Sequence, residues 1–175
     1  MLKASQSFNA ELLSYINEAR ARHAGEILYS NTYERDIIEY DETGLGICVG
    51  TEVVTETILG GGTPLILSED LCKAAAIRAV EIWYSGNRYY TQLHRRADGR
   101  DFNVFDCFDS DLCIKEENLF ESHLHFPNPS GVVEVWEGMP SDSYVEEHIN
   151  MLSSQHTEIG LCYNYEDGVW VVLFR

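Results

Sequence analysis

The chain has 175 residues, of which 45% are hydrophobic, and this is enough apolar material for one globular core. Twelve Lys and Arg oppose 29 Asp and Glu, so the formal net charge is -17 at pH 7. Phosphate backbones and anionic membranes repel a surface this acidic, which argues against direct nucleic-acid binding and favours cationic partners or divalent ions.

The five cysteines are too few, and odd in number, for a disulfide scaffold. Cys72 and Cys162 lie in apolar patterns and are predicted core thiols, whereas the spacing of Cys107 and Cys113 leaves a disulfide between them open. The first residues contain no apolar segment typical of a signal peptide, and no apolar run of about 18 residues could span a bilayer. We therefore expect one soluble domain over residues 1–175 with no membrane insertion.

The first predicted element is a helix over residues 8–25. Ser7 or Asn9 caps its start and Gly25 ends it. Its apolar positions recur at helical spacing: Leu12, Leu13, Ile16 and Ala19. Residues 26–63 differ, because Thr, Val, Ile and Tyr alternate there with turn signals, and this composition predicts extended strands or a hairpin.

A second helix is predicted from Ser68, a favourable N-cap, to Gly86. One face of it carries Leu71, Ala74, Ala75, Arg78 and Ile82. Residues 87–129 are rich in loops, and residues 130–136 fit a helix or a strand equally well.

Near the C-terminus, Ser143 and Glu146 form a capping box before a short helix over residues 144–152. The last segment reads as two strands joined by a tight turn at residues 166–168. Helices on both sides of interleaved strands indicate a layered α+β domain.

Six short motifs follow one another in a recognisable order. They are Asn17-Glu18-Ala19-Arg20, Leu71-Cys72-Lys73-Ala74-Ala75, His94 followed by Asp98-Gly99, Glu116-Glu117-Asn118, Asn150-Met151-Leu152 and Thr157-Glu158-Ile159-Gly160. In this order the chain resembles the CAP superfamily of cysteine-rich secretory and pathogenesis-related proteins (SCP domain), and in particular its bacterial-type members. The resemblance covers about residues 8–25 and 65–175.

The resemblance implies a three-layer α-β-α sandwich with a surface cleft that holds two His and two acidic residues. In the family this tetrad is linked to divalent-metal binding and to hydrolysis, and many members act by binding lipids or proteins instead. His94 matches the first His, and Glu117 matches the Glu of the family's G-E-N motif, where Glu116 replaces the Gly. These two are the candidate catalytic residues.

The other half of the tetrad departs from the family pattern. The second His position falls on Glu147 with His148 beside it, and helical neighbours point about 100° apart. Near Trp136 the candidates for the second acid are Glu137 and Glu134, and neither has the expected offset.

A cluster of His94, Glu117 and Glu147, with His148, remains a candidate metal site. Imidazole with carboxylates suits zinc or manganese, and carboxylates alone suit calcium or magnesium. The alternative is a hydrogen-bonded polar cluster that orders loops. The pair His123 and His125 is assigned to a loop or core role.

Residues 26–63 form an insertion relative to the family, near the first helix. Two interpretations are open: the segment lengthens the sheet, or it offers an edge strand to another chain. Together with the incomplete tetrad, it favours a non-catalytic binding or assembly module with a protein partner or a homo-oligomer. Such a protein would suit a virus particle or an extracellular assembly, and a cytoplasmic location stays open. The alternative is a divalent-metal-dependent hydrolase.

Overall fold

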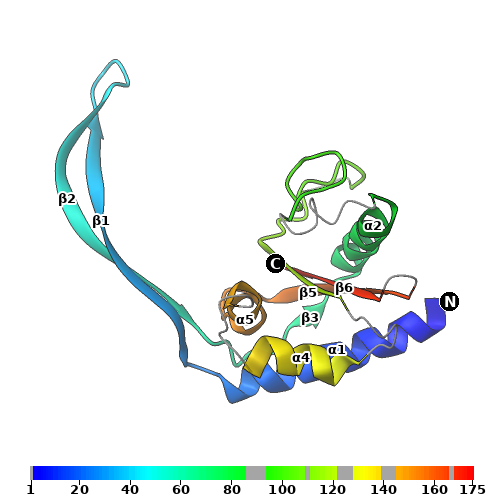
Figure 1. Ribbon diagram of the computed structural model, residues 1–175. Helices are drawn as coiled ribbons and strands as arrows, with labels where there is room; N and C mark the ends of the chain where they lie inside the picture. The colour runs from blue at the N-terminus through cyan, green and yellow to red at the C-terminus, as the bar shows by residue number, and fades with distance from the viewer. Residues whose placement is uncertain (1, 86–93, 109–110, 122–127, 139–144, 166–167) are drawn as a thin grey trace.

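The computed structural model describes residues 2–85, 94–108, 111–121, 128–138, 145–165 and 168–175 (Figure 1). Within these residues the chain is a mixed α+β protein with four helices and two sheets. The helices are α1 (Leu2–Arg22), α2 (Glu69–Ser85), α4 (Pro129–Gly138) and α5 (Val145–Leu152). The strands are β1 (Ile27–Tyr40), β2 (Gly46–Leu59), β3 (Ile66–Leu67), β4 (Glu116–Glu121), β5 (Glu158–Asn164) and β6 (Val169–Phe174).

The central sheet has the strand order β3-β5-β6-β4, in which β3 runs parallel to β5 and the other pairs are antiparallel. All six side chains of β6 are buried, because the sheet has a hydrophobic core on each face. Trp170, Val172 and Phe174 join one core, whereas Val171 and Leu173 join the other. The two-residue periodicity of a strand sends successive side chains to opposite faces.

Helices cover both faces of this sheet (Figure 1). The core on one face is closed by α1, α4 and α5, and the core on the other face by α2 together with Leu112 and Ile114. The helix α2 crosses β5 at Gly160, where an added Cβ would lie 2.4 Å from the carbonyl oxygen of Leu71. Glycine at this position therefore sets how closely the second layer approaches the sheet.

The Asn17 and Arg20 side chains fasten later parts of the chain to α1. The amide of Asn17 exchanges two hydrogen bonds with the backbone of Leu65, at 2.7 and 3.2 Å. The buried guanidinium of Arg20 donates to the carbonyl oxygens of Met151, Ser153, His156 and Thr63. Asn17 and Arg20, which belong to the first of the six sequence motifs, therefore have a structural role in this fold.

Strands β1 and β2 form a separate antiparallel hairpin, residues 27–59, which we call the arm. The arm projects away from the rest of the chain (Figure 1), and with 14 residues per strand at about 3.3 Å each it reaches roughly 45 Å. Its base is held by hydrogen bonds of Gly60 with Glu26 and Gly25, and by one from Ser154 to Leu59. Leu28 packs against the core.

The strands or hairpin predicted within residues 26–63 are thus confirmed as a hairpin over residues 27–59. The arm does not lengthen the central sheet, so that interpretation is wrong. The first helix begins at Leu2, earlier than the capping residues predict. Residues 130–136 belong to the helix α4, because Val132, Val133 and Trp136 face the core at helical spacing.

None of the five cysteines, all of which lie in described residues, forms a disulfide, so Cys107 and Cys113 are not bonded to each other. Cys72 and Cys162, which we predict to be core thiols, are only half-buried. Among the described helices, none has the length and apolar character needed to cross a membrane.

Candidate functional site

His94 lies on a short loop that folds back on itself between α2 and β4. Its backbone has a φ of 51°, in the left-handed region that non-glycine residues seldom occupy. The loop closes through an antiparallel bridge between Arg95 and Asp101 and a turn at Gly99, whose φ is 85°. The Asp-Gly pair read in the sequence therefore forms the turn that presents His94.

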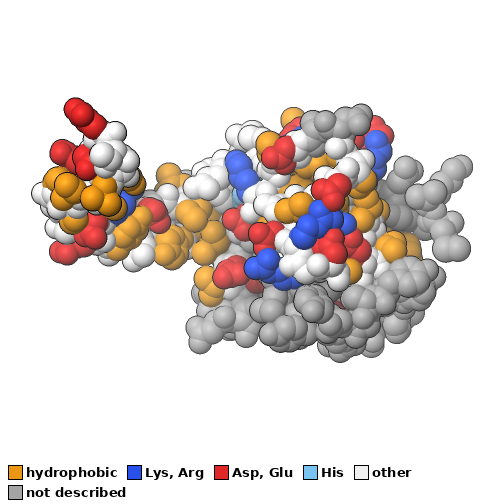
Figure 2. Space-filling model, turned by 90° about the horizontal axis from the view of Figure 1, so that it is seen from above, with side chains coloured by type: hydrophobic (Ala, Val, Ile, Leu, Met, Phe, Trp, Pro, Cys, Tyr) orange, Lys and Arg blue, Asp and Glu red, His pale blue; other side chains and the backbone are white. Residues whose placement is uncertain are grey.

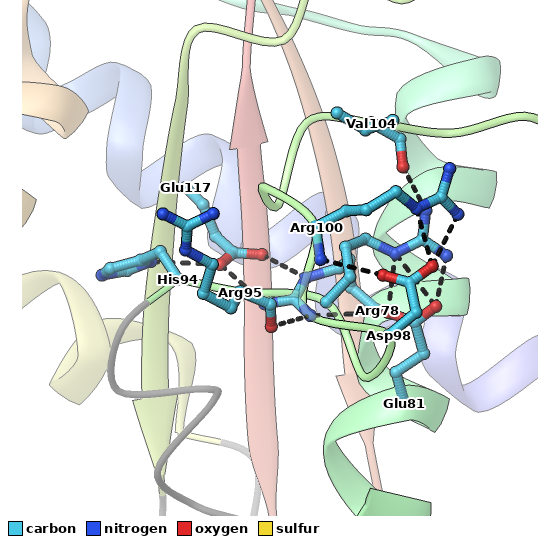
Figure 3. Close-up of polar contacts among 9 residues, drawn as sticks. Arg78, Glu81, His94, Arg95, Asp98, Arg100, Val104 and Glu117 are labelled. Carbon is cyan, nitrogen blue, oxygen red and sulfur yellow. Dashed lines mark hydrogen bonds and ion pairs between the residues drawn. The ribbon is translucent and has the colours of Figure 1, made fainter.

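The side chains of His94, Glu117 and Arg78 meet under this loop (Figure 3). His94 Nδ1 lies 3.0 Å from Glu117 Oε1. Arg78 Nε donates to Glu117 Oε2 at 2.7 Å, and Arg78 Nη2 donates to Oε1 at 2.9 Å. Glu117 is on β4 and Arg78 on α2, so the cluster joins the sheet, the helix and the loop.

A second ion pair extends the cluster along α2. Arg78 Nη1 donates to the carbonyl oxygen of Arg95 at 3.1 Å and lies 3.4 Å from Glu81. Glu81 in turn accepts hydrogen bonds from Arg96, which also donates to the carbonyl oxygen of Val104 (Figure 3). These contacts fix the loop to the helix at several points.

Burial alone would raise the pKa of Glu117, but its hydrogen bonds with His94 and Arg78 outweigh burial and hold that pKa below the usual range. The hydrogen bond with Glu117 raises the pKa of His94 against the effect of burial, and nearby Glu147 and Glu146 raise it further. The cluster therefore favours an ionised carboxylate with a protonated imidazole at mildly acidic pH.

Three further carboxylates, Glu116, Glu146 and Glu147, interact with His94 through their charges, and among the described residues no hydrogen bond joins them to it. Burial raises the pKa of Glu147 and of Glu116, and the charge of Glu146 adds to both shifts. The helix α5, which carries Glu146 and Glu147, is held beside β4 by the amide of Asn118, which donates to the Glu147 carbonyl oxygen at 2.8 Å.

His148 lies elsewhere. Its Nδ1 is 2.9 Å from the carbonyl oxygen of Trp136, and its ring is 5.9 Å from the ring of His23. Glu137 is also on that side, where it accepts hydrogen bonds from Arg22 and contacts His23 at 3.1 Å. The structure thus joins His94 and Glu117 by a hydrogen bond and places Glu147 near enough for its charge to act on His94, whereas His148 is hydrogen-bonded to Trp136.

The chemistry open to this cluster is set by Arg78. Both oxygens of Glu117 already accept from the guanidinium, and Oε1 is shared with His94. A cation bound by Glu117 would compete with a buried positive charge. Among the residues that the structure describes, no group of three or more His, Cys, Asp or Glu side chains is placed to hold a metal ion.

Sequence reasoning placed Arg78 on the buried face of α2 but gave it no partner. A signal was present, because an arginine within an apolar face needs a buried acid or buried carbonyl oxygens as partners. Glu134, one candidate for the second acid, is exposed. His123 and His125 lie outside the described residues.

The arm presents a second candidate site. In the half of the arm nearer the body, polar side chains on the two strands bond to each other. The hydroxyl groups of Thr32 and Thr55 lie 3.0 Å apart, and Tyr33 donates a hydrogen bond to Glu56 at 2.6 Å. Arg35 forms an ion pair with Glu52. The Tyr33 side chain and its cross-strand partner Val54 are half-buried against the ribbon.

The far end of the arm, residues 36–49, is different, and we call it the tip. A β-bulge at Ile37 and Ile38 marks its start. Its large apolar side chains are exposed: Ile37, Ile38, Tyr40, Leu45, Ile47 and Val49. Tyr40 is 70% exposed and Leu45 64%, so these residues find no cover within the described chain. Figure 2 shows hydrophobic and acidic side chains together at this end of the arm.

The chain matches no protein-family model, no curated protein sequence and no solved structure at the significance required of a match. The likeness to the CAP superfamily therefore stays a prediction from the motifs.

Proposed function

We propose that this protein is a non-catalytic binding or assembly module, in which a CAP-type α-β-α sandwich carries the arm and the arm holds a protein partner. The observation that carries the proposal is the exposed apolar tip. A two-stranded ribbon is at best marginally stable by itself in water, and contiguous exposed apolar side chains mark interaction sites. A component of a virus particle or of an extracellular assembly fits this description.

The body supports the arm as a rigid base. Gly60 and Gly61 come so close to α1 and to the segment after α5 that an added Cβ on Gly60 would lie 2.0 Å from the His23 carbonyl oxygen. Arg20 braces the same region through carbonyl oxygens on both sides. Because the base is fixed, a contact made at the tip holds the body at a defined distance from the partner.

Site-specific photo-crosslinking in the native source tests the proposal. A photoreactive amino acid at Tyr40 in the tip is compared with one at Val80 on α2, which is 50% exposed. We expect a discrete adduct from position 40 alone, and competition by unlabelled full-length chain. A short-arm variant, in which Asn-Gly replaces residues 30–57 between the opposed Tyr29 and Ile58, should not compete. Equal adducts at both positions, or equal competition by both competitors, would contradict the arm's role.

A divalent-metal-dependent hydrolase is the second candidate. The observation in its favour is the His94 side chain, which is 32% exposed and bonded to a buried carboxylate with other acids nearby. Metal content by mass spectrometry and a hydrolase panel on the wild type and His94→Ala provide the test. Equal background activity in both proteins would exclude this candidate.

A further inference from the structure

The tip combines apolar side chains with unpaired negative charge. Asp36, Glu39, Asp41 and Glu42 lie among residues 36–49, and this stretch contains no Lys, Arg or His. Asp36, Glu39 and Glu42 are exposed, and in the described chain no ion pair neutralises them. Asp41 is used by the turn itself, because its Oδ1 accepts hydrogen bonds from Thr43 and Leu45.

Apolar side chains occur on both faces of the tip. Asp36, Ile38 and Tyr40 lie on one face, because side chains alternate along a strand. The other face carries Ile37 and Glu39, and Ile47 lies opposite Glu39 on the neighbouring strand. Each face thus carries an apolar centre with at least one carboxylate beside it. A surface of this kind is complementary to an apolar groove with basic side chains at its rim.

In the part of the chain that the structure describes, the basic side chains already have partners. In the described part of the chain, eight Lys and Arg side chains are in ion pairs with its own acids: Arg22, Arg35, Lys73, Arg78, Arg95, Arg96, Arg100 and Arg175. Arg20 is buried against carbonyl oxygens, and Lys115 donates to the carbonyl oxygen of Gln155. With a net charge of -17, a second copy would add repulsion instead of complementary charge.

We infer that the tip inserts with both of its faces into a basic-rimmed apolar groove of a different protein, with Tyr40, Leu45 and Ile47 as the buried anchors and Asp36, Glu39 and Glu42 facing the rim. This inference rests on the proposed function, because it names the chemistry of the partner that the arm holds. Anionic membranes are disfavoured by the same charges. The charged rim accelerates and orients encounter, and the apolar anchors slow dissociation.

The test uses full-length protein and labelled peptides in fluorescence anisotropy. The probes are a peptide of alternating Lys and Leu, its Glu-Leu counterpart, and a Lys-Ser peptide of equal length and charge. We expect the Lys-Leu peptide alone to bind, with affinity that falls as salt rises from about 50 to about 300 mM. Binding of the Glu-Leu peptide, or equal binding of Lys-Ser and Lys-Leu, overturns the inference.

Three variants locate the contact. The charge variant Asp36→Asn, Glu39→Gln, Glu42→Gln and the anchor variant Tyr40→Ser, Leu45→Ser, Ile47→Ser should each bind the Lys-Leu peptide about ten-fold more weakly or worse. The control variant Glu11→Gln, Glu69→Gln, Glu134→Gln makes the same charge change at exposed sites on the body and should bind as the wild type. Equal weakening in the control assigns binding to net charge and overturns the inference.

Two further measurements test whether the tip instead binds a second copy of this chain or a membrane. Anchor-dependent dimerisation in sedimentation equilibrium, or anchor-dependent binding to phosphatidylcholine or phosphatidylserine vesicles, would replace the basic protein partner with a second copy or a membrane. Repeating the native-source crosslinking with the charge variant separates the two proposals. If the charge variant still gives the adduct, the arm binds a partner as proposed, but the inference that the partner's groove has a basic rim is overturned.

Discussion

Arg78 donates two parallel hydrogen bonds to Glu117, from Nε at 2.7 Å and from Nη2 at 2.9 Å, although the two side chains are only 1% and 0% exposed. The pair ties the helix α2 to the strand β4 through the sheet's second core. Because each charge is removed from water, each depends on the other. The His94 loop is attached to this pair and depends on it for its position.

Replacing Glu117 with Gln should lower the free energy of unfolding by about 3–5 kcal/mol, because the buried charge of Arg78 loses its bidentate partner and keeps only Glu81 as a counter-ion, 3.4 Å away. Urea unfolding followed by circular dichroism measures the change. Glu69→Gln is the matched control, since the Glu69 side chain is 85% exposed, and it should change stability by less than about 0.5 kcal/mol. A Glu117→Gln variant as stable as the control would show that the ion pair is unimportant.

The His94 side chain should titrate above the ordinary histidine pKa of about 6.5, and Glu117→Gln should bring its pKa down. The raised pKa means that its contribution to stability is complete below the unfolded value and is lost as pH rises through the folded value. Proton NMR of the His94 ring in both proteins measures the shift. An unchanged His94 pKa in the variant would argue against the hydrogen bond.

His156 should act in the opposite direction. Burial, with the charges of Lys115 and Arg20, lowers its pKa to about 4. In the unfolded chain the same imidazole takes up its proton near pH 6.5, so protonation favours unfolding below that pH. The contribution of neutral His156 to stability is therefore fully present above about pH 6.5 and falls by about 3 kcal/mol as the pH drops toward 4.

The matched variant is His156→Phe, whose ring keeps the contact with Phe174, now 5.2 Å between ring centroids. Its stability should vary less with pH than that of the wild type between pH 6.5 and 4. Denaturant midpoints at several pH values report the difference, and parallel pH profiles for both proteins would contradict the assignment.

Gly160→Ala should destabilise the protein by about 1–3 kcal/mol or more, because the new methyl group meets the backbone of Leu71, which cannot turn aside. Gly138→Ala is the control, since a Cβ at Gly138 meets nothing within 4 Å. Thermal unfolding of both variants gives the comparison. Equal melting temperatures would mean that α2 and β5 can separate at little cost.

Local patterns were sufficient for much of the fold. The hairpin over residues 26–63 and the helix from Ser68 follow from composition, periodicity and capping, which act within a few residues. The helix α4 could not be chosen over a strand from residues 130–136 alone. Packing of Val132, Val133 and Trp136 against the core decided it.

The candidate site was only partly predictable. His94 and Glu117 were identified by the motifs that carry them, and the structure places them 3.0 Å apart. Arg78 was missed as a partner, since no local rule links a residue of α2 with one on β4 that is 39 positions away. The His94 loop is held in place by bonds to α2, from Arg78 to the Arg95 carbonyl oxygen and from Arg96 to Glu81.

The sequence by itself determined the acidic charge, the helix from Ser68 and the strands of the arm, because these depend on composition and on neighbours along the chain. Only the tertiary structure decided that the charge of Glu147 acts on His94, whereas His148 contacts Trp136 and His23. The two residues are adjacent, but about 100° of helical rotation separates their directions, and the packing of α5 against both β4 and α4 sets their different surroundings. The tertiary structure also shows that the arm leaves the body just after α1 and that its tip has no cover from the described residues.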